Sequence, residues 1–237
     1  MKLQELKENV WHCNLEIPKH SLAVYTFGNV SAIDREKGVM AIKPSGVPYE
    51  LLKPEDIVVV DLDGRVVEGS LSPSSDTKTH LVLYNEFPKI GGIVHTHSTY
   101  ATAWAQAARP IPVFGTTHAD HLHLDIPCTE FMPDDKIQND YEIETGRQIT
   151  KVFQEISYEE VEMVLVAGHA PFTWGKTPEK AVYNSVVLEE LARMALLTIQ
   201  IDPQTPRLND VLIQKHYQRK HGPHSYYGQS NSSKQKK

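Results

Sequence analysis

The sequence predicts an α/β protein in which strands and helices are interspersed around one hydrophobic core. Short runs rich in β-branched residues alternate with longer segments whose apolar residues recur every three or four positions. The 237 residues and 40% apolar content also suit one globular core. We therefore expect a single domain over residues 1–228 and a polar, disordered tail over residues 229–237. These patterns leave strand order and direction open.

Helices are expected where the apolar spacing is three or four residues. The first should occupy about residues 3–17 and end near Pro18. A second should begin after the Ser-Ser-Asp sequence at residues 74–76, because these side chains favour helix N-termini. Further helices are expected at about residues 98–108, 140–156, 178–199 and 207–220.

Strands are expected where short apolar runs lie between Gly and Pro turns. Prolines and histidines interrupt residues 111–132, so no clear period is visible there. The predicted strands are residues 22–27, 39–42, 57–62, 91–97 and 163–167.

Composition indicates the compartment and the classes of partner. The net charge of −6 gives no reason to expect binding to nucleic acid or to an anionic membrane, so an anionic substrate must be held locally. The two cysteines, Cys13 and Cys128, fit free thiols in a reducing compartment. The first residues lack the apolar core of a secretory signal, and charges interrupt the apolar stretch 186–201. We expect a cytoplasmic protein.

A metal site is indicated by His95-Thr96-His97. Side chains two apart on a strand point to the same face, so both imidazoles can reach one ion. His169 follows the expected strand 163–167 and can supply a third imidazole, which would leave coordination positions open for a substrate. Spacing alone leaves open that these are hydrogen-bonded core histidines.

A phosphate site is indicated by three turns with small residues. They are Gly28-Asn29, Lys43-Pro44-Ser45-Gly46 and Pro73-Ser74-Ser75. Amides, hydroxyls and an ammonium in such turns can surround an oxyanion. Each turn taken singly is also explained by capping and loop chemistry.

Residues 170–177 read Ala-Pro-Phe-Thr-Trp-Gly-Lys-Thr and lie between an expected strand and an expected helix, as a nucleotide-binding P-loop does. A P-loop begins with glycine so that its backbone can wrap the phosphates, whereas this segment begins with Ala170 and contains Pro171 and Trp174. We interpret the match as a coincidence.

Several further motifs accompany these segments along the chain. The full set is Gly28-Asn29-Val30-Ser31, Lys43-Pro44-Ser45-Gly46-Val47, Pro73-Ser74-Ser75-Asp76-Thr77, Gly92-Ile93-Val94-His95-Thr96-His97-Ser98, Gly115-Thr116-Thr117-His118-Ala119-Asp120, Lys215-His216-Tyr217, Arg219-Lys220-His221-Gly222 and Tyr226-Tyr227-Gly228-Gln229. In this order they resemble the L-ribulose-5-phosphate 4-epimerases of the class II aldolase and adducin superfamily, from the first helix to Gly228. The resemblance implies a three-layer α/β/α sandwich with a mostly antiparallel central sheet. It also implies a homotetramer whose active sites lie between neighbouring subunits.

The resemblance also implies residue roles. The metal site would comprise His95, His97 and His169 with Asp76 beside them, binding Zn²⁺ or another divalent ion such as Mn²⁺ or Co²⁺. Asp120 and Tyr227 would be the catalytic acid and base. The phosphate would be bound by Asn29, Lys43, Ser45, Gly46, Ser74 and Ser75, and the assisting residues from the adjoining subunit would be Thr116, Glu142 and His216. Taken separately, Asp120, Tyr227 and Glu142 could be ordinary surface residues.

The implied reaction interconverts L-ribulose 5-phosphate and D-xylulose 5-phosphate, in arabinose or ascorbate breakdown, by cleaving and re-forming the C3–C4 bond through an enediolate. A class II sugar-phosphate aldolase is the nearest alternative, although Asp76 favours an epimerase because aldolase relatives tend to carry Glu there. A non-catalytic domain like the adducin head is the other alternative, and the intact histidines disfavour it.

Four positions depart from the family pattern. Phe27 replaces a frequent Trp, His121 a usual Tyr or Phe, and Glu130 an expected basic residue. Ala170 replaces a common glycine, which leaves the local backbone in question if that position needs a positive φ.

Overall fold

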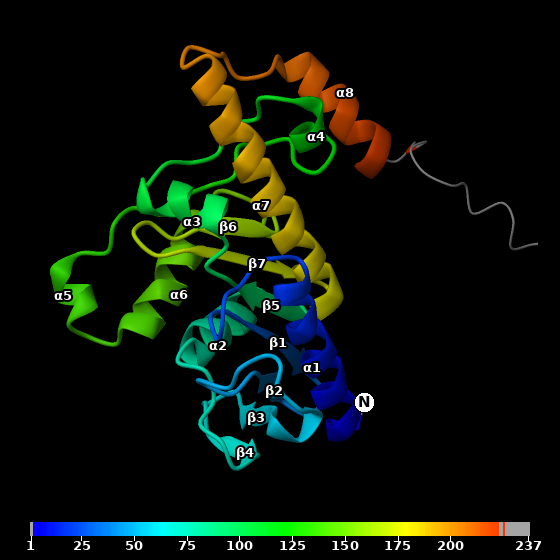
Figure 1. The fold of residues 1–237 in the computed structure, drawn as a ribbon, viewed down its shortest axis with the longest axis vertical. Helices are drawn as coiled ribbons and strands as arrows, with labels where there is room; N and C mark the ends of the chain where they lie inside the picture. The colour runs from blue at the N-terminus through cyan, green and yellow to red at the C-terminus, as the bar shows by residue number, and fades with distance from the viewer. Residues whose placement is uncertain (1, 223–224, 226–237) are drawn as a thin grey trace, which may run out of the picture.

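The computed structural model describes residues 2–222 and 225, and its centre is a seven-stranded sheet with the order β4-β3-β2-β1-β5-β7-β6 (Figure 1). Every pair of neighbouring strands is antiparallel. The strands are β1 (Asn29–Asp34), β2 (Val39–Ile42), β3 (Val58–Asp61), β4 (Val66–Glu68), β5 (Gly92–His95), β6 (Met163–Leu165) and β7 (Pro171–Gly175).

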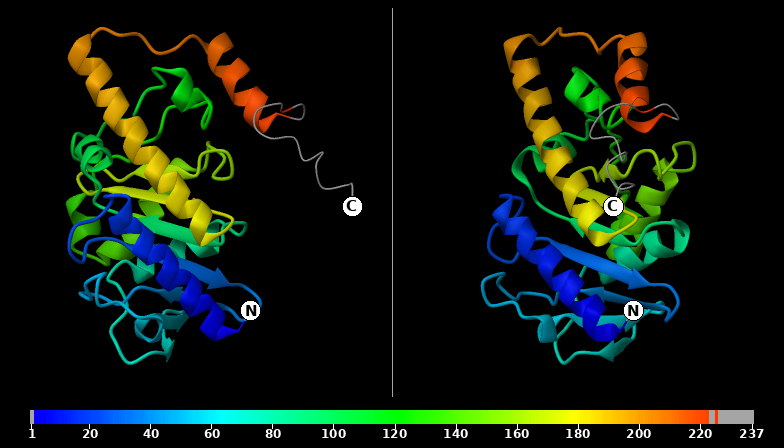
Figure 2. Two further views of the ribbon diagram at one scale, coloured as in Figure 1. Left: turned by 45° about the vertical axis from the view of Figure 1, so that its right-hand side comes forward. Right: turned by 90° about the vertical axis from the view of Figure 1, so that its right-hand side faces the viewer.

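Helices cover both faces of this sheet. On one face, α1 contacts β1 and β2 while α7 contacts β5 and β7; α2 and α6 pack together on the other face (Figure 1 and Figure 2). The helices are α1 (Leu3–Lys19), α2 (Thr77–Glu86), α3 (Thr99–Gln106), α4 (Thr116–Ala119), α5 (Asp134–Ile137), α6 (Tyr141–Val152), α7 (Pro178–Ile201), α8 (Asp210–His221) and a short 3-10 helix (Pro54–Asp56).

The short apolar strand β2 packs against helices on both faces of the sheet. Val39 and Ala41 belong to the apolar cluster that contains Leu6 and Val10 of α1, whereas Met40 and Ile42 belong to the larger cluster that contains Leu83 of α2. Successive side chains on a strand point to opposite faces, so a strand covered on both sides is apolar throughout. The predicted three-layer α/β/α sandwich with an antiparallel sheet is confirmed.

The prediction of a strand at residues 22–27 is wrong. These residues form a loop between α1 and β1, in which Tyr25 has a left-handed backbone with φ 56°. Val24, Tyr25 and Phe27 are 60%, 78% and 54% exposed, so the apolar run does not mark a buried strand. The strand begins instead at Asn29.

Two further strands were not predicted. Strand β4 is an exposed edge strand of only three residues, which is too short to show a period. Strand β7 occupies the segment that resembles a P-loop, and all of its residues are buried between β5 and β6. The interpretation of that resemblance as a coincidence therefore agrees with the fold.

The C-terminal part of α7 extends beyond the sheet, and α4 and α8 lie at the same end of the molecule (Figure 2). A small apolar cluster of Val113, Ala119 and Ile213 joins α8 to α4. The backbone amide of Leu208 also donates to the carbonyl oxygen of Val113 at 2.7 Å. Residues 111–132, which showed no period, thus contain the short helix on which α8 rests.

In the described part of the chain, no helix is both long and apolar enough to cross a membrane. The predicted tail, residues 229–237, and the predicted catalytic residue Tyr227 lie outside the described residues. The domain boundary at residue 228 therefore stays a prediction.

Candidate metal and phosphate site

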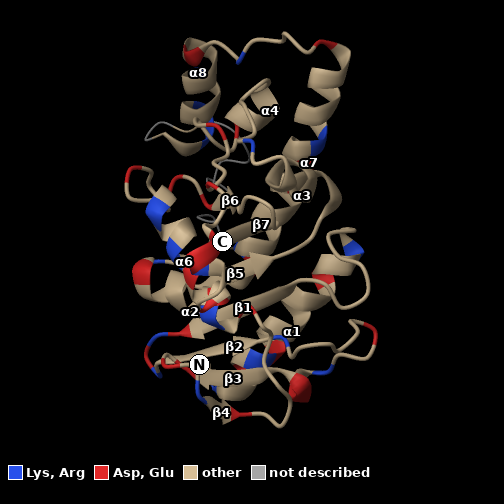
Figure 3. Cartoon of the chain, turned by 90° about the vertical axis from the view of Figure 1, so that its left-hand side faces the viewer, with Lys and Arg blue, Asp and Glu red and all other residues tan. Residues whose placement is uncertain are grey.

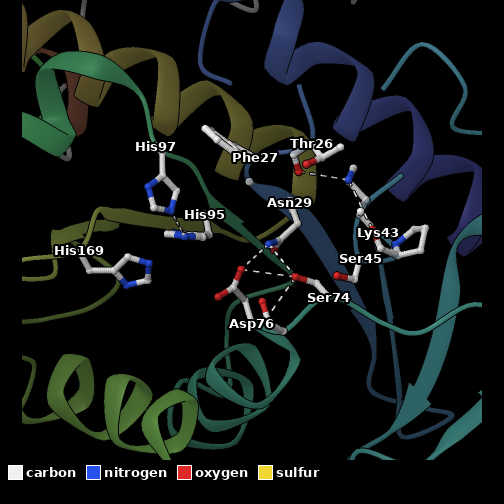
Figure 4. A pocket seen from close by; sticks show the side chains of 14 residues that line it. Thr26, Phe27, Asn29, Lys43, Ser45, Ser74, Asp76, His95, His97 and His169 are labelled. Carbon is white, nitrogen blue, oxygen red and sulfur yellow. Dashed lines mark hydrogen bonds between the residues drawn. The ribbon is translucent and has the colours of Figure 1, made fainter. Parts of the chain in front are cut away.

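A pocket of about 440 Å³ opens at one end of the sheet (Figure 4). The antiparallel order places the start of β1, the end of β2, the end of β5 and the start of β7 at this end. Histidines predicted to bind a metal and residues predicted to bind phosphate therefore meet in one cavity. Its lining residues are Thr26, Phe27, Gly28, Asn29, Lys43, Pro44, Ser45, Gly46, Ser74, Ser75, Asp76, His95, His97 and His169.

Three histidines converge at one side of this pocket. Nε2 of His95 lies 3.2 Å from Nε2 of His97, and one nitrogen from each of His95, His97 and His169 lies within 4.8 Å of the other two. His95 ends β5, and His169 follows a tight turn at Gly168, whose φ is 71°. The three imidazoles come from separate stretches of chain and can reach one ion.

The hydrogen bonds of these histidines fit a bound divalent cation. Nδ1 of His95 lies 3.0 Å from the carbonyl oxygen of Pro171, so it carries the proton and Nε2 presents a lone pair to the cluster. Nδ1 of His169 is buried without a hydrogen-bond partner among the described residues. Burial first, and then the neighbouring histidines, lower the pKa of His169 to about 4, which keeps its imidazole neutral as a metal ligand must be.

Asp76 lies beside this ligand cluster but is not among the three residues whose ligand atoms lie within 4.8 Å of one another, so its part in the metal's ligand set stays a prediction. Its Oδ2 accepts hydrogen bonds from Nδ2 of Asn29 at 2.7 Å and from the hydroxyl of Ser74 at 3.4 Å. The cluster of described residues close enough to share an ion contains the three histidines alone. Asp76 caps α2 by position, but its side chain makes no capping hydrogen bond and faces the pocket.

The charge of Asp76 acts on the site from a short distance. Burial would raise the pKa of Asp76, but electrostatic interaction with His95 and His80 and the hydrogen bond from Asn29 hold it below its ordinary value. The carboxylate is therefore ionised and adds negative charge beside the three imidazoles. Nδ2 of Asn29 donates to this carboxylate, while its Oδ1 is buried without a partner in the described chain.

Lys43 defines the phosphate end of the pocket. It is only 1% exposed, and its ammonium contacts the carbonyl oxygens of Thr26 and Pro44, each at 3.4 Å, and the ring of Tyr49 at 4.9 Å. Burial lowers the pKa of Lys43 to about 8. No ion pair of Lys43 with a carboxylate is found within the described chain, so this ammonium suits an anionic ligand.

The anion site is local and does not depend on a basic surface. On the face drawn in Figure 3, basic and acidic residues are interspersed.

Gly28 lets the loop before β1 pass close to β5: its φ is 78°, and a Cβ there would lie 2.7 Å from the carbonyl oxygen of His95. Sequence reasoning missed Tyr49, whose hydroxyl donates to the carbonyl oxygens of Phe27 and Gly28 at 2.8 and 3.0 Å. No local pattern marks it.

The departures from the family pattern are accommodated. Ala170 is fully buried and does not adopt a positive φ, which Gly168 takes instead. The ring of Phe27 lies 6.1 Å from that of His97. Glu130 lies 3.6 Å from Lys151 and His121 packs 5.9 Å from Tyr183, with neither lining the pocket.

Of the predicted acid–base pair, Asp120 is the member that the structure describes, and it does not line this pocket. Asp120 follows α4, and its carboxylate accepts hydrogen bonds from His216 and Arg219 of α8. Burial would raise the pKa of Asp120, but these two partners hold it below its ordinary value. Thr116 lies on α4 as well, and none of these four residues lines the pocket.

Glu142 lies in a different place. It is in the first turn of α6, where its carbonyl oxygen accepts a hydrogen bond from the Thr79 hydroxyl at 2.7 Å. The neighbouring ring of Tyr141 is 6.1 Å from that of His169. Glu142 therefore belongs to the helix beside this chain's own histidines, apart from the group around Asp120.

Comparison with known proteins identifies similar sequences and folds. The profile described as Class II Aldolase and Adducin N-terminal domain matches residues 8–196. Proteins named L-ribulose-5-phosphate 4-epimerase UlaF from Salmonella paratyphi B and Salmonella typhi are each 52% identical over 227 residues, which cover 96% of this chain and 100% of each relative. A solved structure named L-fuculose 1-phosphate aldolase has a TM-score of 0.76 at 26% identity, covering 91% of this chain and 95% of that one.

Proposed function

This chain belongs to the class II aldolase and adducin N-terminal domain family, and we propose that it is an L-ribulose-5-phosphate 4-epimerase. It interconverts L-ribulose 5-phosphate and D-xylulose 5-phosphate. The observation that carries this function is the pocket itself, which holds three imidazoles at one side and, at the other, a buried ammonium that pairs with no carboxylate among the described residues. A sugar phosphate needs both a group that accepts charge from its reacting carbons and a group that holds its phosphate.

The metal site consists of His95, His97 and His169, and the resident ion is Zn²⁺, with Mn²⁺ or Co²⁺ as substitutes. Nitrogen ligands and open coordination positions are typical of a catalytic zinc site. A bound ion supplies an electrophile that stabilises negative charge developing on the sugar. Asp76 is ionised beside the imidazoles and holds Asn29 in place.

The chain's own residues bind the substrate and move protons. Lys43, Asn29, Ser45, Gly46, Ser74 and Ser75 bind the phosphate, which retains the aldehyde fragment after the C3–C4 bond breaks. Because only the loose end of that fragment must turn, it can be attacked on its other face, which inverts C4. A base takes the proton of the C4 hydroxyl as the bond breaks, and an acid returns a proton after the bond re-forms.

Asp120 and Tyr227 exchange these protons, one on each face of the substrate, with assistance from Thr116, His216 and Glu142. Because Asp120 and His216 do not line the pocket of their own chain, we propose a homotetramer with active sites between neighbouring subunits. The exposed rings of Tyr25 and Phe27 beside the pocket support an interface there, because large apolar side chains at a rim favour a partner surface.

Subunit complementation tests this arrangement. His97→Ala should lose bound metal and activity together, while Asp120→Asn should keep its metal and lose turnover. When the two inactive variants are unfolded together and refolded, mixed tetramers should contain some sites with an intact pocket and an intact Asp120, and activity should return. If each variant is inactive alone and mixed tetramers form without any activity, the shared site is ruled out.

The nearest competing activity is that of a sugar-phosphate aldolase, because the solved structure with that name shares the fold at 26% identity. An aldolase releases the aldehyde that an epimerase recaptures. Supplying L-ribulose 5-phosphate and measuring both D-xylulose 5-phosphate and free glycolaldehyde phosphate separates the two. Sustained release of the aldehyde without the epimer would refute the proposed activity, and a metal-free protein with full activity would refute the metal site.

The cellular setting and pathway are also proposals. The free thiols of Cys13 and Cys128 support a reducing, cytoplasmic compartment. Burial raises the pKa of Cys13 to about 12 and that of Cys128 to about 11, so neither thiol is poised as a nucleophile. We propose a role in arabinose catabolism, with ascorbate breakdown as the other route that contains the same substrate.

A further inference from the structure

Asp120 is held by an arginine that the sequence analysis did not assign to the site. Nε of Arg219 donates to Oδ1 of Asp120 at 3.0 Å, and Nη2 donates to Oδ2 at 2.8 Å. His216 adds a hydrogen bond from Nδ1 to Oδ1 at 3.0 Å, and Nε2 of His221 bonds the backbone carbonyl oxygen of Asp120 at 2.9 Å. One end of α8 thus holds both the side chain and the backbone of this residue.

The apolar contact between α8 and α4 is small, so the position of Asp120 relative to α8 depends largely on these hydrogen bonds. Ile213 is the one buried residue of α8, and it packs with Val113 and Ala119. The side chain of Asp120 is 17% exposed and that of Arg219 is 25% exposed, so the ion pair is partly shielded from water. A planar guanidinium that donates to both oxygens fixes a carboxylate in a way that a point charge cannot.

The two carboxylate oxygens differ in what they can still accept. In the described chain, Oδ1 accepts two hydrogen bonds, from His216 and Arg219, whereas Oδ2 accepts one, from Arg219. Each carboxylate oxygen has two lone pairs. Oδ1 is therefore fully used, and Oδ2 keeps one lone pair that can meet a substrate hydroxyl.

We propose that Arg219 is a positioning residue for the reaction, which orients the carboxylate of Asp120 so that its proton is exchanged at Oδ2. This inference rests on the proposed function, because it assumes that Asp120 transfers a proton to or from the sugar. Arg219 itself does not touch the substrate. Its effect is on the chemical step, so kcat should depend on it while binding of the phosphate and of the metal should not.

A matched pair of variants tests this, Arg219→Gln and the control Arg207→Gln. Arg207 also joins the α8 region to the loop after α4, but its hydrogen bonds go to Asp125 at 2.9 Å and to two other groups, and none reaches Asp120. We expect Arg219→Gln to lower kcat about 100-fold, as a displacement of about 1 Å can do. KM and bound metal should stay at wild-type values, and Arg207→Gln should keep its kcat.

The geometry of the contact is tested by Arg219→Lys, which keeps the charge but cannot donate to both oxygens. Its kcat should stay at least about tenfold below wild type, because bidentate orientation is lost. This variant also covers the case in which Arg219→Gln fails to fold. A wild-type kcat in Arg219→Lys would overturn the claim that orientation, and not charge alone, is what Arg219 supplies.

A double variant separates positioning from a general structural effect. If Arg219 acts through Asp120, then Asp120→Asn should lower kcat about 10²- to 10⁴-fold, and adding Arg219→Gln should lower it no further. Multiplying losses would overturn the inference. Full turnover in Asp120→Asn would instead refute the role of Asp120 in the proposed function. An impaired Asp120→Asn beside a fully active Arg219→Gln would refute the positioning inference alone.

Discussion

Replacing Lys43 with Met should make the folded protein more stable and at the same time weaken its binding of phosphate. The ammonium of Lys43 is buried against two carbonyl oxygens and the Tyr49 ring instead of a carboxylate. A charge in such a place costs free energy that an anionic ligand would offset. Met is a flexible, uncharged side chain that can fill the same space.

The magnitude follows from the pKa. Burial lowers the pKa of Lys43 from 10.5 to about 8. At about 1.4 kcal/mol for each tenfold change in the protonation equilibrium, keeping the ammonium charged in the folded protein costs about 3 kcal/mol. Losing the contact with the Tyr49 ring removes about 1 kcal/mol of stability. We expect Lys43→Met to raise the free energy of unfolding by about 2 kcal/mol at pH 7, which raises Tm by roughly 4–8 °C.

The pH dependence has a defined sign. The pKa of Lys43 is lower in the folded than in the unfolded protein, so the destabilisation is fully present below about pH 8 and disappears as the pH rises towards 10.5. The Tm difference between Lys43→Met and wild type should therefore shrink from pH 7 to pH 10. Phosphate affinity of the wild type should fall over the same range, because the ammonium loses its proton.

Thermal unfolding with and without inorganic phosphate measures both effects. Phosphate should raise the Tm of the wild type and leave that of Lys43→Met unchanged. Lys180→Met is a matched control, because Lys180 also lies over a tyrosine ring, that of Tyr183 at 4.7 Å, but has Glu162 at 3.5 Å. It should not gain stability. A Lys43→Met variant that is less stable than wild type at pH 7, or that keeps the phosphate-induced rise, would refute the reasoning.

Three further substitutions probe the pocket. His169→Ala should reduce bound metal to below one ion per subunit and abolish turnover, as elemental analysis and the epimerase assay would record; unchanged metal content would contradict the three-histidine site. Gly28→Ala should lower the free energy of unfolding by roughly 1–2 kcal/mol because of its positive φ, and further because the new Cβ would clash with the His95 carbonyl oxygen. The control Gly38→Ala has a φ of 64° but open space around it, so denaturant unfolding should show only the loss that comes from φ. Tyr49→Phe should raise KM for the sugar phosphate by roughly three- to tenfold through loss of two hydrogen bonds to the loop; an unchanged KM would show that the loop holds its shape without them.

Local patterns predicted those parts of the site that one strand or one turn determines. The run that ends in His95-Thr96-His97 contains β5, which ends at His95, so the paired imidazoles were visible in the sequence although His97 lies two residues beyond the strand. Local patterns gave the wrong interpretation where a side chain lines the pocket instead of packing in the core. Phe27 suggested a strand but is exposed at the rim, and Asp76 suggested a helix cap but hydrogen-bonds Asn29.

By itself the sequence determined the longer helices, several of the strands and the side chains that can carry metal and phosphate chemistry, because periodicity and residue type act over a few positions. The tertiary structure alone decided that Lys43 and His169 share one pocket, since this depends on the antiparallel strand order. It also decided that Arg219 holds Asp120, a pairing across 99 positions that no local spacing encodes. Contacts between distant segments arise only when separate apolar faces are buried together.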